Sequence, residues 1–385
     1  MGIRVLHIVG ASKYGGGFSV IFSLCRMARE KGMEPFVLTS DPVGQQECKR
    51  RGITVVAFAG IERAIRPWKD FYDGRRLATY LAQERFEIVH THTSKGGMIG
   101  RYAASRAKVP AAFHTVHGFS AHEFSSLPAR MVVAALERRA AHWCDLVLVM
   151  NSYDEAWARG FCKPEKFVYV PNGIPPERLA ASQGASRDML LSEVGIPASA
   201  HVIGNICRLC VAKNLSQFVE TIAHLPHVAG RPVFGLLVGD GESMASLRAL
   251  VEQLGITQRM IFLGFRDDAV RWLAAMDLFL STSRREGMSI SLLEAMGAGR
   301  AIVGTKIRGN VDCLQNGKNG ILVPFGDAAA TAKACQTLLE APEYAHSLGR
   351  QAYESFLVNH TEDVFIKRVW ERAYLPVLRE KGLNP

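Results

Sequence analysis

Two carboxylates, Glu286 and Glu294, stand eight residues apart where the sequence changes from a strand pattern to a helix pattern. The apolar residues 278–281 predict a buried strand, and residues 289–296 predict a helix. Backbone amides at the start of a helix lack partners within that helix, so they favour phosphate or sugar oxygens. Glu286 in the turn is placed to reach hydroxyls, and Glu294 one turn into the helix is placed to hold a diol. The amides concerned are those of Gly287, Met288 and Ser289.

Two cations follow the first predicted strand of the second half of the chain. That strand spans residues 202–206, and Arg208 and Lys213 come after it, five residues apart. The planar fork of an arginine and the point charge of a lysine can bracket a pyrophosphate, and they suit the charge that builds on a departing nucleoside diphosphate. Ordinary surface cations would give the same pattern, so this pair alone does not establish a site.

Glycine turns follow three other predicted strands. The turn at 15–17 opens the first helix, and without a Cβ its backbone can approach a phosphate closely. A merely tight strand-to-helix turn explains it equally well, since the sequence is not a G-x-G-x-x-G fingerprint. The turns at 239–241 and 263–266 come at the carboxyl ends of strands, where ligands bind in open sheets, although such turns also occur for structural reasons. The candidate binding residues are Gly16, Gly17, Gly239, Gly264, Phe265 and Arg266.

His117 ends another predicted strand and could donate a hydrogen bond to a sugar hydroxyl, although a histidine satisfied within its own loop fits equally well. Other histidines nearby in the sequence are His90, His92, His114 and His122. They lack the H-E-x-x-H spacing of a metal site, and no D-x-D motif is present, so a site without metal is expected. Cys207 and Cys210 have the spacing of half a zinc or redox site, but no second pair accompanies them.

Short apolar runs alternate with helical-period segments along the first 180 residues. The runs lie at 3–9, 35–38, 54–58, 88–91, 111–115, 146–149 and 167–170. This alternation predicts a parallel, doubly wound sheet. The series stops at 171–176, where turn residues cluster, and a stretch of low hydrophobicity follows at 180–186. A hinge is therefore expected between the two halves.

A second series of strands and helices follows, so an α/β fold of two facing Rossmann-like domains is expected. The length of 385 residues also exceeds what one hydrophobic core usually organises. The closing segment holds helical stretches and an apolar stripe that includes Trp370 and Tyr374, but no strand. The expected domains are therefore 1–180, 181–358, and a helix at 359–385 that returns to the first domain.

The net charge of +10 is unevenly distributed, with +9 on residues 1–180 and +1 on residues 181–385. The first half is therefore expected to meet something anionic, such as nucleic acid, a lipid surface or a phosphorylated acceptor, unless these are ordinary solvated faces. The eight dispersed cysteines favour a reducing cytosol. No stretch approaches the roughly 20 apolar residues of a membrane-spanning helix, and the run at 3–9 is too short for a signal peptide.

Together these motifs resemble those of the family 4 glycosyltransferases, which have the two-domain GT-B fold and retain anomeric configuration. The matching segments are 15–17, 115–118, 170–174, Arg208 with Lys213, 239–241, 263–265, and Glu286 through Glu294. The resemblance implies that Arg208 and Lys213 hold the donor diphosphate and that Glu294 holds the ribose diol. Glu286 and the turn after it would hold the donor sugar, Gly16 would lie against the phosphate, and His117 would touch the sugar near the reacting carbon.

One segment departs from the family pattern. Where relatives often have Gly-Gly-x-x-Glu after the strand at 301–304, this chain has Arg308-Gly-Asn-Val-Asp312. A looser resemblance, in the stretch 89–97, is to members that extend lipid-linked sugars for surface polysaccharides such as lipopolysaccharide or capsule.

The resemblance implies transfer from a nucleotide sugar to a lipid-linked or saccharide acceptor, with no metal or other cofactor. A UDP donor is preferred and GDP-mannose is the alternative. Basic segments with neighbouring apolar residues at 65–69, 101–108 and 130–139 predict peripheral binding at the cytoplasmic face of an anionic membrane. A nucleic-acid partner is not expected, because the basic residues are dispersed and lack a recognised module.

Two other functions fit the same residues. One is a sugar-nucleotide epimerase or hydrolase on this fold, which would act without an acceptor. The other is a non-catalytic sugar-nucleotide-binding protein, against which the presence of all four charged residues argues.

Overall fold

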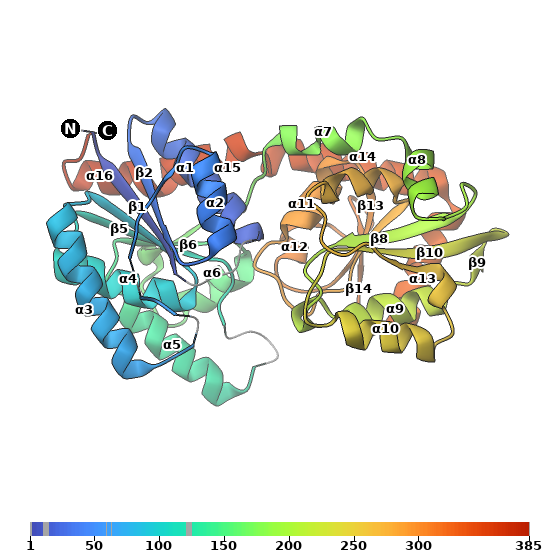
Figure 1. Cartoon of the computed structure of the whole chain (residues 1–385), viewed down its shortest axis with the longest axis horizontal. Helices are drawn as coiled ribbons and strands as arrows, with labels where there is room; N and C mark the ends of the chain where they lie inside the picture. The colour runs from blue at the N-terminus through green and yellow to red at the C-terminus, as the bar shows by residue number, and fades with distance from the viewer. Residues whose placement is uncertain (1, 11–14, 59, 63, 121–124, 385) are drawn as a thin grey trace. The chain divides into compact units, whose positions relative to one another are not determined.

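The computed structural model describes residues 2–10, 15–58, 60–62, 64–120 and 125–384. The chain divides into two compact units (Figure 1). Unit 1 is Met1–Asn172 with Asp363–Pro385, and unit 2 is Gly173–Glu362.

Unit 1 is a parallel sheet covered by helices. Its strands are β1 (Arg4–Gly10), β2 (Glu34–Thr39), β3 (Thr54–Val55), β4 (Ile88–His92), β5 (Ala111–Val116), β6 (Leu146–Val149) and β7 (Phe167–Tyr169). Its helices are α1 (Gly16–Glu30), α2 (Pro42–Arg50), α3 (Pro67–Glu84), α4 (Ser94–Ala107), α5 (Leu127–Ala141), α6 (Ser152–Arg159) and the short η1 (Pro164–Lys166). The expected strand at 54–58 is shorter than predicted, since only Thr54–Val55 pairs with β2.

The strand order in unit 1 is β3-β2-β1-β4-β5-β6-β7, so the winding changes direction between β1 and β4. The chain runs from β1 outward to β3 and then crosses back to β4. In open α/β sheets a ligand binds beyond the carboxyl ends of the strands at such a switch point. β1 and β4 are buried on both faces, and β1 is accordingly apolar apart from Arg4 and His7, whereas β4 buries three polar residues, His90, Thr91 and His92.

Unit 2 repeats this architecture. Its strands are β8 (His201–Ile206), β9 (His227–Val228), β10 (Arg231–Val238), β11 (Met260–Phe262), β12 (Leu278–Ser281), β13 (Ala301–Thr305) and β14 (Ile321–Val323). Its helices are η2 (Pro176–Leu179), α7 (Ala180–Gln183), α8 (Arg187–Glu193), η3 (Val211–Lys213), α9 (Leu215–Ala223), α10 (Met244–Gln253), η4 (Thr257–Arg259), η5 (Ala269–Ala275), α11 (Ile290–Gly297), α12 (Asn310–Cys313), α13 (Ala328–Glu340) and α14 (Pro342–Asn359).

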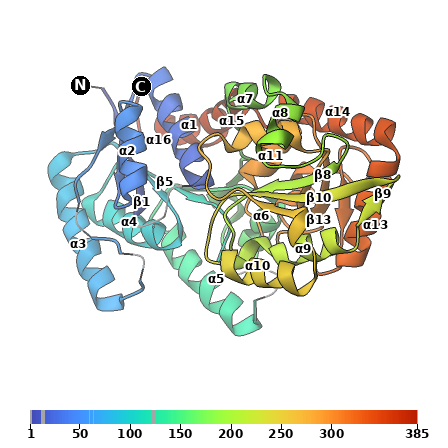
Figure 2. The same ribbon diagram turned by 45° about the vertical axis from the view of Figure 1, so that its right-hand side comes forward.

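The main path of the second sheet is β11-β10-β8-β12-β13-β14, with the switch point between β8 and β12. Figure 2 shows α9 and α10 along one face of this sheet and α11 along the other. The core between β10, β11 and α9 is closely packed; a Cβ at Gly235 of β10, for example, would lie 2.3 Å from the sulfur of Met260 of β11 and 2.9 Å from Ile222 of α9.

The C-terminal segment belongs to unit 1. It consists of α15 (Glu362–Val369), the π-helical turn η6 (Trp370–Tyr374) and α16 (Leu375–Glu380). The Tyr374 ring stacks on Phe113 of β5 at 4.3 Å between ring centroids, and Lys381 forms a 2.9 Å ion pair with Asp145. The returning helix that the sequence predicts is thus joined to the first domain by aromatic stacking and an ion pair.

The boundaries between the units differ from those expected at 180 and 358. Unit 2 begins at Gly173 because Ile174 exchanges backbone hydrogen bonds with His360 and Glu362. These bonds tie the start of the second unit to its end, and η2 packs on α11. The change in composition at 180–186 could not reveal this pairing, because the paired residues are far apart in the sequence.

Candidate active site

Lys213 and Glu286 form an ion pair at the carboxyl edge of the unit 2 sheet. Lys213 ends η3 after β8, and Glu286 follows the neighbouring strand β12. The Lys213 Nζ lies 2.5 Å from Glu286 Oε1, and the Ser283 hydroxyl donates to the same oxygen at 2.7 Å. Burial, the largest single influence, lowers the pKa of Lys213, but the Glu286 carboxylate and smaller contributions from Cys207 and Cys210 together raise it above its ordinary value. Lys213 is therefore a fixed cation at neutral pH.

Glu294 lies inside α11 and is paired with an arginine that the sequence analysis did not identify. The Arg178 Nε donates to Glu294 Oε1 at 2.5 Å, and the glutamate side chain is only 3% exposed. Burial raises the pKa of Glu294, and Arg178 opposes that shift. Arg178 comes from η2, the segment expected to be a hinge, so no local motif could have linked it to Glu294.

The turn before α11 rests against the segment that departs from the family pattern. A Cβ at Gly309 would lie 2.8 Å from the Gly287 carbonyl oxygen, and Gly309 has a φ of +81°. Met288 is buried, and the Ser289 hydroxyl contacts Ser291 at 3.2 Å rather than capping the helix. The side chains of this turn are thus engaged locally, and ligand contacts would fall to its backbone.

Arg208 is paired with a carboxylate of the next loop. Its Nη2 lies 2.9 Å from Glu242 Oε2, and both side chains are about half exposed. A Cβ at Gly239 would lie 1.9 Å from the Cys207 carbonyl oxygen. Glycine at 239 is therefore explained by the close approach of these two loops, which also positions Arg208 beside Glu242.

The turn after β11 combines an open glycine with an exposed ring. Gly264 has a φ of +69° with open space around it, and its carbonyl accepts a hydrogen bond from the Gly239 amide at 2.8 Å. Phe265 is 69% exposed, which suits stacking on a ligand ring. Arg266 is instead engaged with Asp268 at 2.8 Å.

The first helix of unit 1 starts with glycines, and among the described residues no atom lies close enough to require a glycine at 15 or 17. Gly16 is the first residue of α1, and a Cβ at Gly17 would meet nothing within 4 Å. This open backbone is compatible with the close ligand approach that the sequence suggests. The preceding residues 11–14 lie outside those described.

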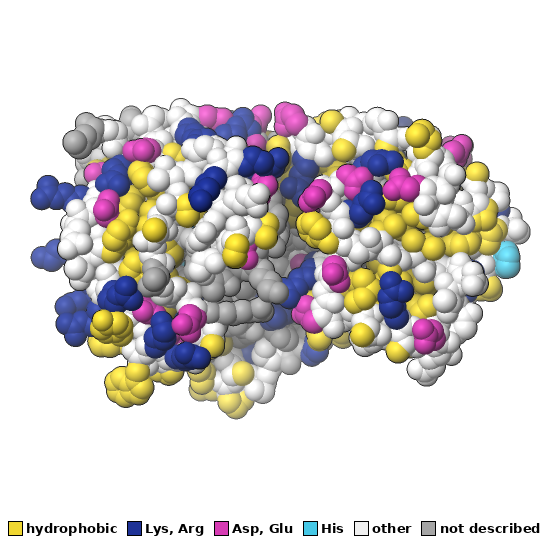
Figure 3. Space-filling view, in the orientation of Figure 1, with side chains coloured by type: hydrophobic (Ala, Val, Ile, Leu, Met, Phe, Trp, Pro, Cys, Tyr) yellow, Lys and Arg dark blue, Asp and Glu magenta, His cyan; other side chains and the backbone are white. Residues whose placement is uncertain are grey.

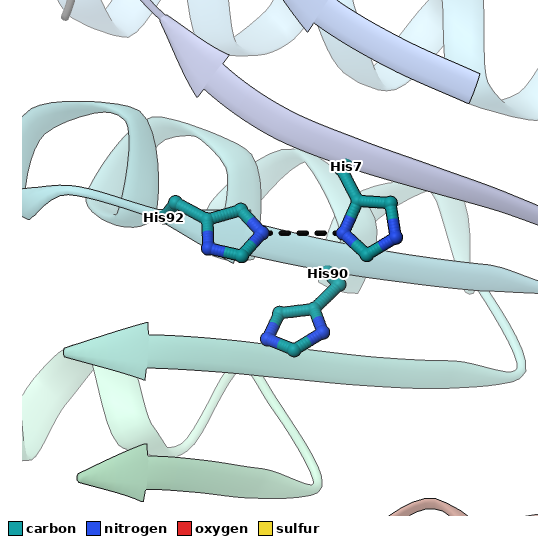
Figure 4. Close-up of side chains that lie close together, drawn as sticks. All are labelled: His7, His90 and His92. Atoms are coloured by element: carbon teal, nitrogen blue, oxygen red, sulfur yellow. Dashed lines mark hydrogen bonds between the residues drawn. The ribbon is translucent and has the colours of Figure 1, made fainter. Parts of the chain in front are cut away.

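His117 follows β5 and ends a row of hydrogen-bonded histidines. Its Nε2 lies 3.3 Å from His92 Nδ1, and His92 Nε2 lies 3.2 Å from His7 Nδ1. Figure 4 shows His7 and His92 pointing toward each other from β1 and β4, with His90 beside them. Burial lowers the pKa of His7 to about 3 and that of His117 to about 4, and it lowers that of His92 as well. These imidazoles are neutral at pH 7.

His7, His90 and His92 also bring nitrogens within 4.8 Å of one another, a spacing that could hold a metal ion. No local spacing in the sequence indicates this group, because His7 is far from the others along the chain. The β1–β4 register places His7 opposite His90. Both His90 nitrogens are already engaged at 2.7 Å, one with the Tyr374 hydroxyl and the other with the Thr115 hydroxyl. His122 lies outside the described residues.

Two family models match successive parts of the chain. The model described as "Glycosyltransferase Family 4" matches residues 14–178, and the model described as "Glycosyl transferases group 1" matches residues 200–341. The two matches fall on opposite sides of the segment that contains α7 and α8.

Curated relatives of the chain are named as glycosyltransferases. The chain is 31% identical over 266 residues to UDP-Gal:alpha-D-GlcNAc-diphosphoundecaprenol alpha-1,3-galactosyltransferase of Escherichia coli. The aligned region covers 67% of this chain and 68% of the relative. It is 24% identical over 378 residues to N,N'-diacetylbacillosaminyl-diphospho-undecaprenol alpha-1,3-N-acetylgalactosaminyltransferase of Campylobacter jejuni, covering 96% and 97% of the two chains.

Solved structures share the fold. Anabaena HepE in complex with UDP and glucose superposes with a TM-score of 0.82 at 20% identity, covering 96% of this chain and 98% of that one. WaaG, a glycosyltransferase involved in lipopolysaccharide biosynthesis, gives a TM-score of 0.76 at 16% identity over 97% and 100% of the two chains.

Among the described residues, no helix combines the length and the apolar character needed to cross a bilayer. The expected GT-B architecture of two parallel-sheet domains is confirmed by the observed topology and these neighbours. From the family models and the Escherichia coli relative, the chain belongs to glycosyltransferase family 4 and is a glycosyltransferase.

Proposed function

We propose that this glycosyltransferase moves a sugar from a UDP-linked donor to a hydroxyl of a lipid-diphosphate-linked saccharide, with retention of configuration, in surface polysaccharide synthesis. The observation that carries the proposal is the Lys213–Glu286 pair at the edge of the unit 2 sheet, because it places a fixed cation beside a carboxylate before a helix start. The acceptor class is supported by two relatives whose names specify undecaprenol-linked diphosphosugars.

Lys213 and Arg208 hold the donor diphosphate in this proposal. Each cation is paired with a carboxylate, Lys213 with Glu286 and Arg208 with Glu242. A diphosphate competes with Glu286 for the Lys213 ammonium. Once released, the Glu286 oxygens can accept hydrogen bonds from hydroxyls of the donor sugar.

The remaining donor contacts in this proposal are those that the resemblance to the family assigns. Glu294, fixed by Arg178, accepts from the ribose diol. The backbone of Gly287, Met288 and Ser289 meets the donor sugar, since the side chains there are engaged locally. Phe265 stacks on the base while the backbone of Gly239, Gly264 and Arg266 reads its edge. Gly16 and Gly17 approach the phosphates, and His117 contacts the reacting sugar.

The reaction breaks the bond between the anomeric carbon and the diphosphate oxygen and forms one to the acceptor oxygen on the same face. The acceptor proton passes to the departing diphosphate, so no protein nucleophile is needed. Arg208 and Lys213 stabilise the negative charge as it grows on the leaving group. These cations supply the charge that a divalent ion would otherwise provide, so we propose a metal-independent site.

The test is release of nucleoside diphosphate from a panel of UDP-N-acetylhexosamines, UDP-hexoses and GDP-mannose. Each donor is supplied with and without an undecaprenyl-diphosphate-sugar acceptor in detergent. Acceptor-dependent release from a UDP-sugar is expected, and it must persist in EDTA. Release of nucleoside diphosphate without acceptor would favour an epimerase or hydrolase. Donor binding without any turnover would favour a non-catalytic binding protein.

We further propose that unit 1 binds an anionic membrane surface, which would place the protein peripherally at the cytoplasmic face. α3 and the residues before it expose Ile65 (81%) and Trp68 (88%), and α5 exposes Leu127 (68%) and Met131 (64%). Figure 3 shows hydrophobic side chains projecting beside Lys and Arg at the lower left, over α3 and α5. Apolar anchors beside cations suit an anionic leaflet.

One predicted basic segment contributes less than expected. Arg101 is fully buried and forms a 2.9 Å ion pair with Glu137, so it joins α4 to α5 rather than facing solvent. Arg106 and Lys108 remain exposed in the same segment.

Vesicle flotation tests this surface. Recovery with anionic vesicles should exceed recovery with neutral ones, and Trp68→Ser with Met131→Ser should abolish the difference. Met189→Ser is the matched control, because Met189 is an equally exposed apolar side chain (70%) in unit 2. Equal recovery with both vesicle types at low salt would contradict the proposal.

A further inference from the structure

The histidine row, defined as His7, His92 and His117, is a continuous chain of ring-to-ring hydrogen bonds. It begins at His7 Nε2, which is buried and has no hydrogen-bond partner among the described residues, and it ends at His117, which is partly exposed. His7 and His92 are fully buried. The row thus connects the interior of the unit 1 sheet with a residue at the end of β5.

Only two hydrogen arrangements are open to such a row. A neutral imidazole carries one N–H and one bare nitrogen, and each bond of the row needs one of each. Burial lowers the pKa of each ring, so all three are neutral at pH 7. The tautomer of any one ring therefore dictates the tautomers of the other two.

The unpaired nitrogen of His7 distinguishes the two arrangements. If His117 donated from Nε2, His92 would donate to His7 Nδ1, and the His7 N–H would remain at Nε2 as a buried donor without an acceptor. In the reverse arrangement His7 donates from Nδ1 and leaves a bare acceptor at Nε2. Buried donors without partners are rarer in proteins than under-satisfied acceptors. The reverse arrangement is favoured.

We propose that His7 and His92 are positioning residues that hold His117 as its Nδ1–H tautomer, so that Nδ1–H donates to an oxygen of the reacting sugar. The proposal rests on the proposed role of His117 as a sugar contact. His92 acts through its Nδ1–H, which occupies His117 Nε2. A donor of fixed direction would orient a hydroxyl or ring oxygen without introducing charge.

His90 has the other tautomer, with its hydrogen on Nε2, and serves as an internal reference. The buried Tyr374 hydroxyl must donate its hydrogen, and His90 Nδ1 is its hydrogen-bond partner at 2.7 Å among the described residues. The pKa of Tyr374 lies well above 10, so that hydrogen stays in place. His90 is therefore the Nε2–H tautomer and donates to the Thr115 hydroxyl.

A metal ion held by this group would require a different network. The 3.2 Å between His7 Nδ1 and His92 Nε2 is close to the distance between two ligand nitrogens of a tetrahedral zinc site. However, the third histidine, His90, already has both nitrogens engaged, and the group contains no acidic or thiol ligand to offset the charge of the ion. Burying an uncompensated divalent charge among neutral groups is costly.

The test is long-range ¹H–¹⁵N correlation on the full-length protein with ¹⁵N-labelled histidine, without substrate. The chain has 12 histidines, so single substitutions assign the signals. His7, His92 and His117 are expected as Nδ1–H tautomers and His90 as Nε2–H. An Nε2–H or mixed tautomer at His117, a cationic ring in the row at pH 7, or stoichiometric bound zinc would overturn the proposal.

Variants then connect the tautomer to turnover. His92→Leu should return His117 to a mixture of tautomers and lower kcat/KM about tenfold, as expected for a lost orienting hydrogen bond. His92→Asn should recover most of the Nδ1–H tautomer of His117 and most of kcat/KM, since the asparagine side-chain amide lies near the position of the histidine Nδ1. Tyr374→Phe is the matched control: it removes a buried hydroxyl beside His90 and should leave the His117 tautomer unchanged.

The two proposals fail in different ways. If the tautomers are as expected but no variant or wild-type protein transfers sugar, the proposed function fails and the row stands. If transfer occurs and His92→Leu retains wild-type kcat/KM, the row has no positioning role.

Discussion

Unit 1 gathers neutral imidazoles within and after β1, β4 and β5, whereas unit 2 pairs cations with carboxylates after β8 and β12. Both groups sit at or near the switch point of a doubly wound sheet. Burial lowers the pKa of the histidines, so they are neutral, but Lys213 stays charged because Glu286 faces it. Similar scaffolds thus support two kinds of polar chemistry, one that fixes the direction of hydrogen bonds and one that holds charge.

The largest expected effect is on the charged site. Lys213→Ala should lower turnover by about 10²-fold or more, because it removes a cation from the departing diphosphate. The Michaelis constant for the donor should change less, since the loss falls on the transition state. Steady-state kinetics with the preferred donor measures both.

Lys333→Ala is the matched control, since Lys333 is an exposed lysine on α13 of the same unit. It should behave as the wild type. Turnover of Lys213→Ala close to that of this control would remove the proposed role of Lys213.

The next largest effect is on folding stability and concerns the buried Arg178–Glu294 ion pair of unit 2. Arg178→Met leaves the Glu294 carboxylate, 3% exposed, without its cation, and should lower the free energy of unfolding by about 2 kcal/mol. Urea denaturation at neutral pH measures the loss. Adding Glu294→Gln should restore most of it, because the uncompensated charge is then gone; no recovery would mean that Arg178 acts through packing.

Acidification should change the contributions of His7 in unit 1 and Glu294 in unit 2 to folding stability in opposite directions. The folded pKa of His7, about 3, lies below its ordinary value of 6.5, so the unfolded chain binds the proton first. Stability is therefore lost as pH falls below 6.5, by about 1.4 kcal/mol at about pH 5.5 for this residue alone. Glu294 has a raised pKa, so it destabilises the folded state above its ordinary value of 4.5, and acidification relieves that penalty.

Tryptophan fluorescence during urea unfolding can follow unit 1 selectively. Four of the five tryptophans belong to unit 1, and Trp272→Phe removes the one in unit 2. In this background His7→Gln should reduce the acid-induced loss by about 1.4 kcal/mol. An unchanged pH dependence would show that His7 does not carry a depressed pKa.

The smallest effect concerns the exposed pair in unit 2. Arg208 and Glu242 are 44% and 55% exposed, so solvent screens their attraction. Glu242→Gln should change the free energy of unfolding by less than about 0.5 kcal/mol. Thermal denaturation at two salt concentrations checks this, and a larger, salt-independent loss would mean that the pair is structurally important.

Local sequence patterns anticipated much of the fold because each strand and helix has its own periodicity. They anticipated the turn at Glu286 and the cations after β8 for the same reason. They missed Arg178 and His7, whose partners lie far away along the chain. They also could not distinguish a ligand-binding glycine from a packed one; the Cys207 carbonyl beside Gly239 emerges only from the folded loops.

The sequence by itself determined the two-sheet α/β architecture, the family, and the residue types available for chemistry, because these depend on periodicity and short motifs. Tertiary structure decided which groups face each other. The β1–β4 register brings His7 toward His92, and the return of the chain at 363 brings Tyr374 to His90. Burial then determines which of these groups carry charge, since desolvation depends on neighbours that no local pattern specifies.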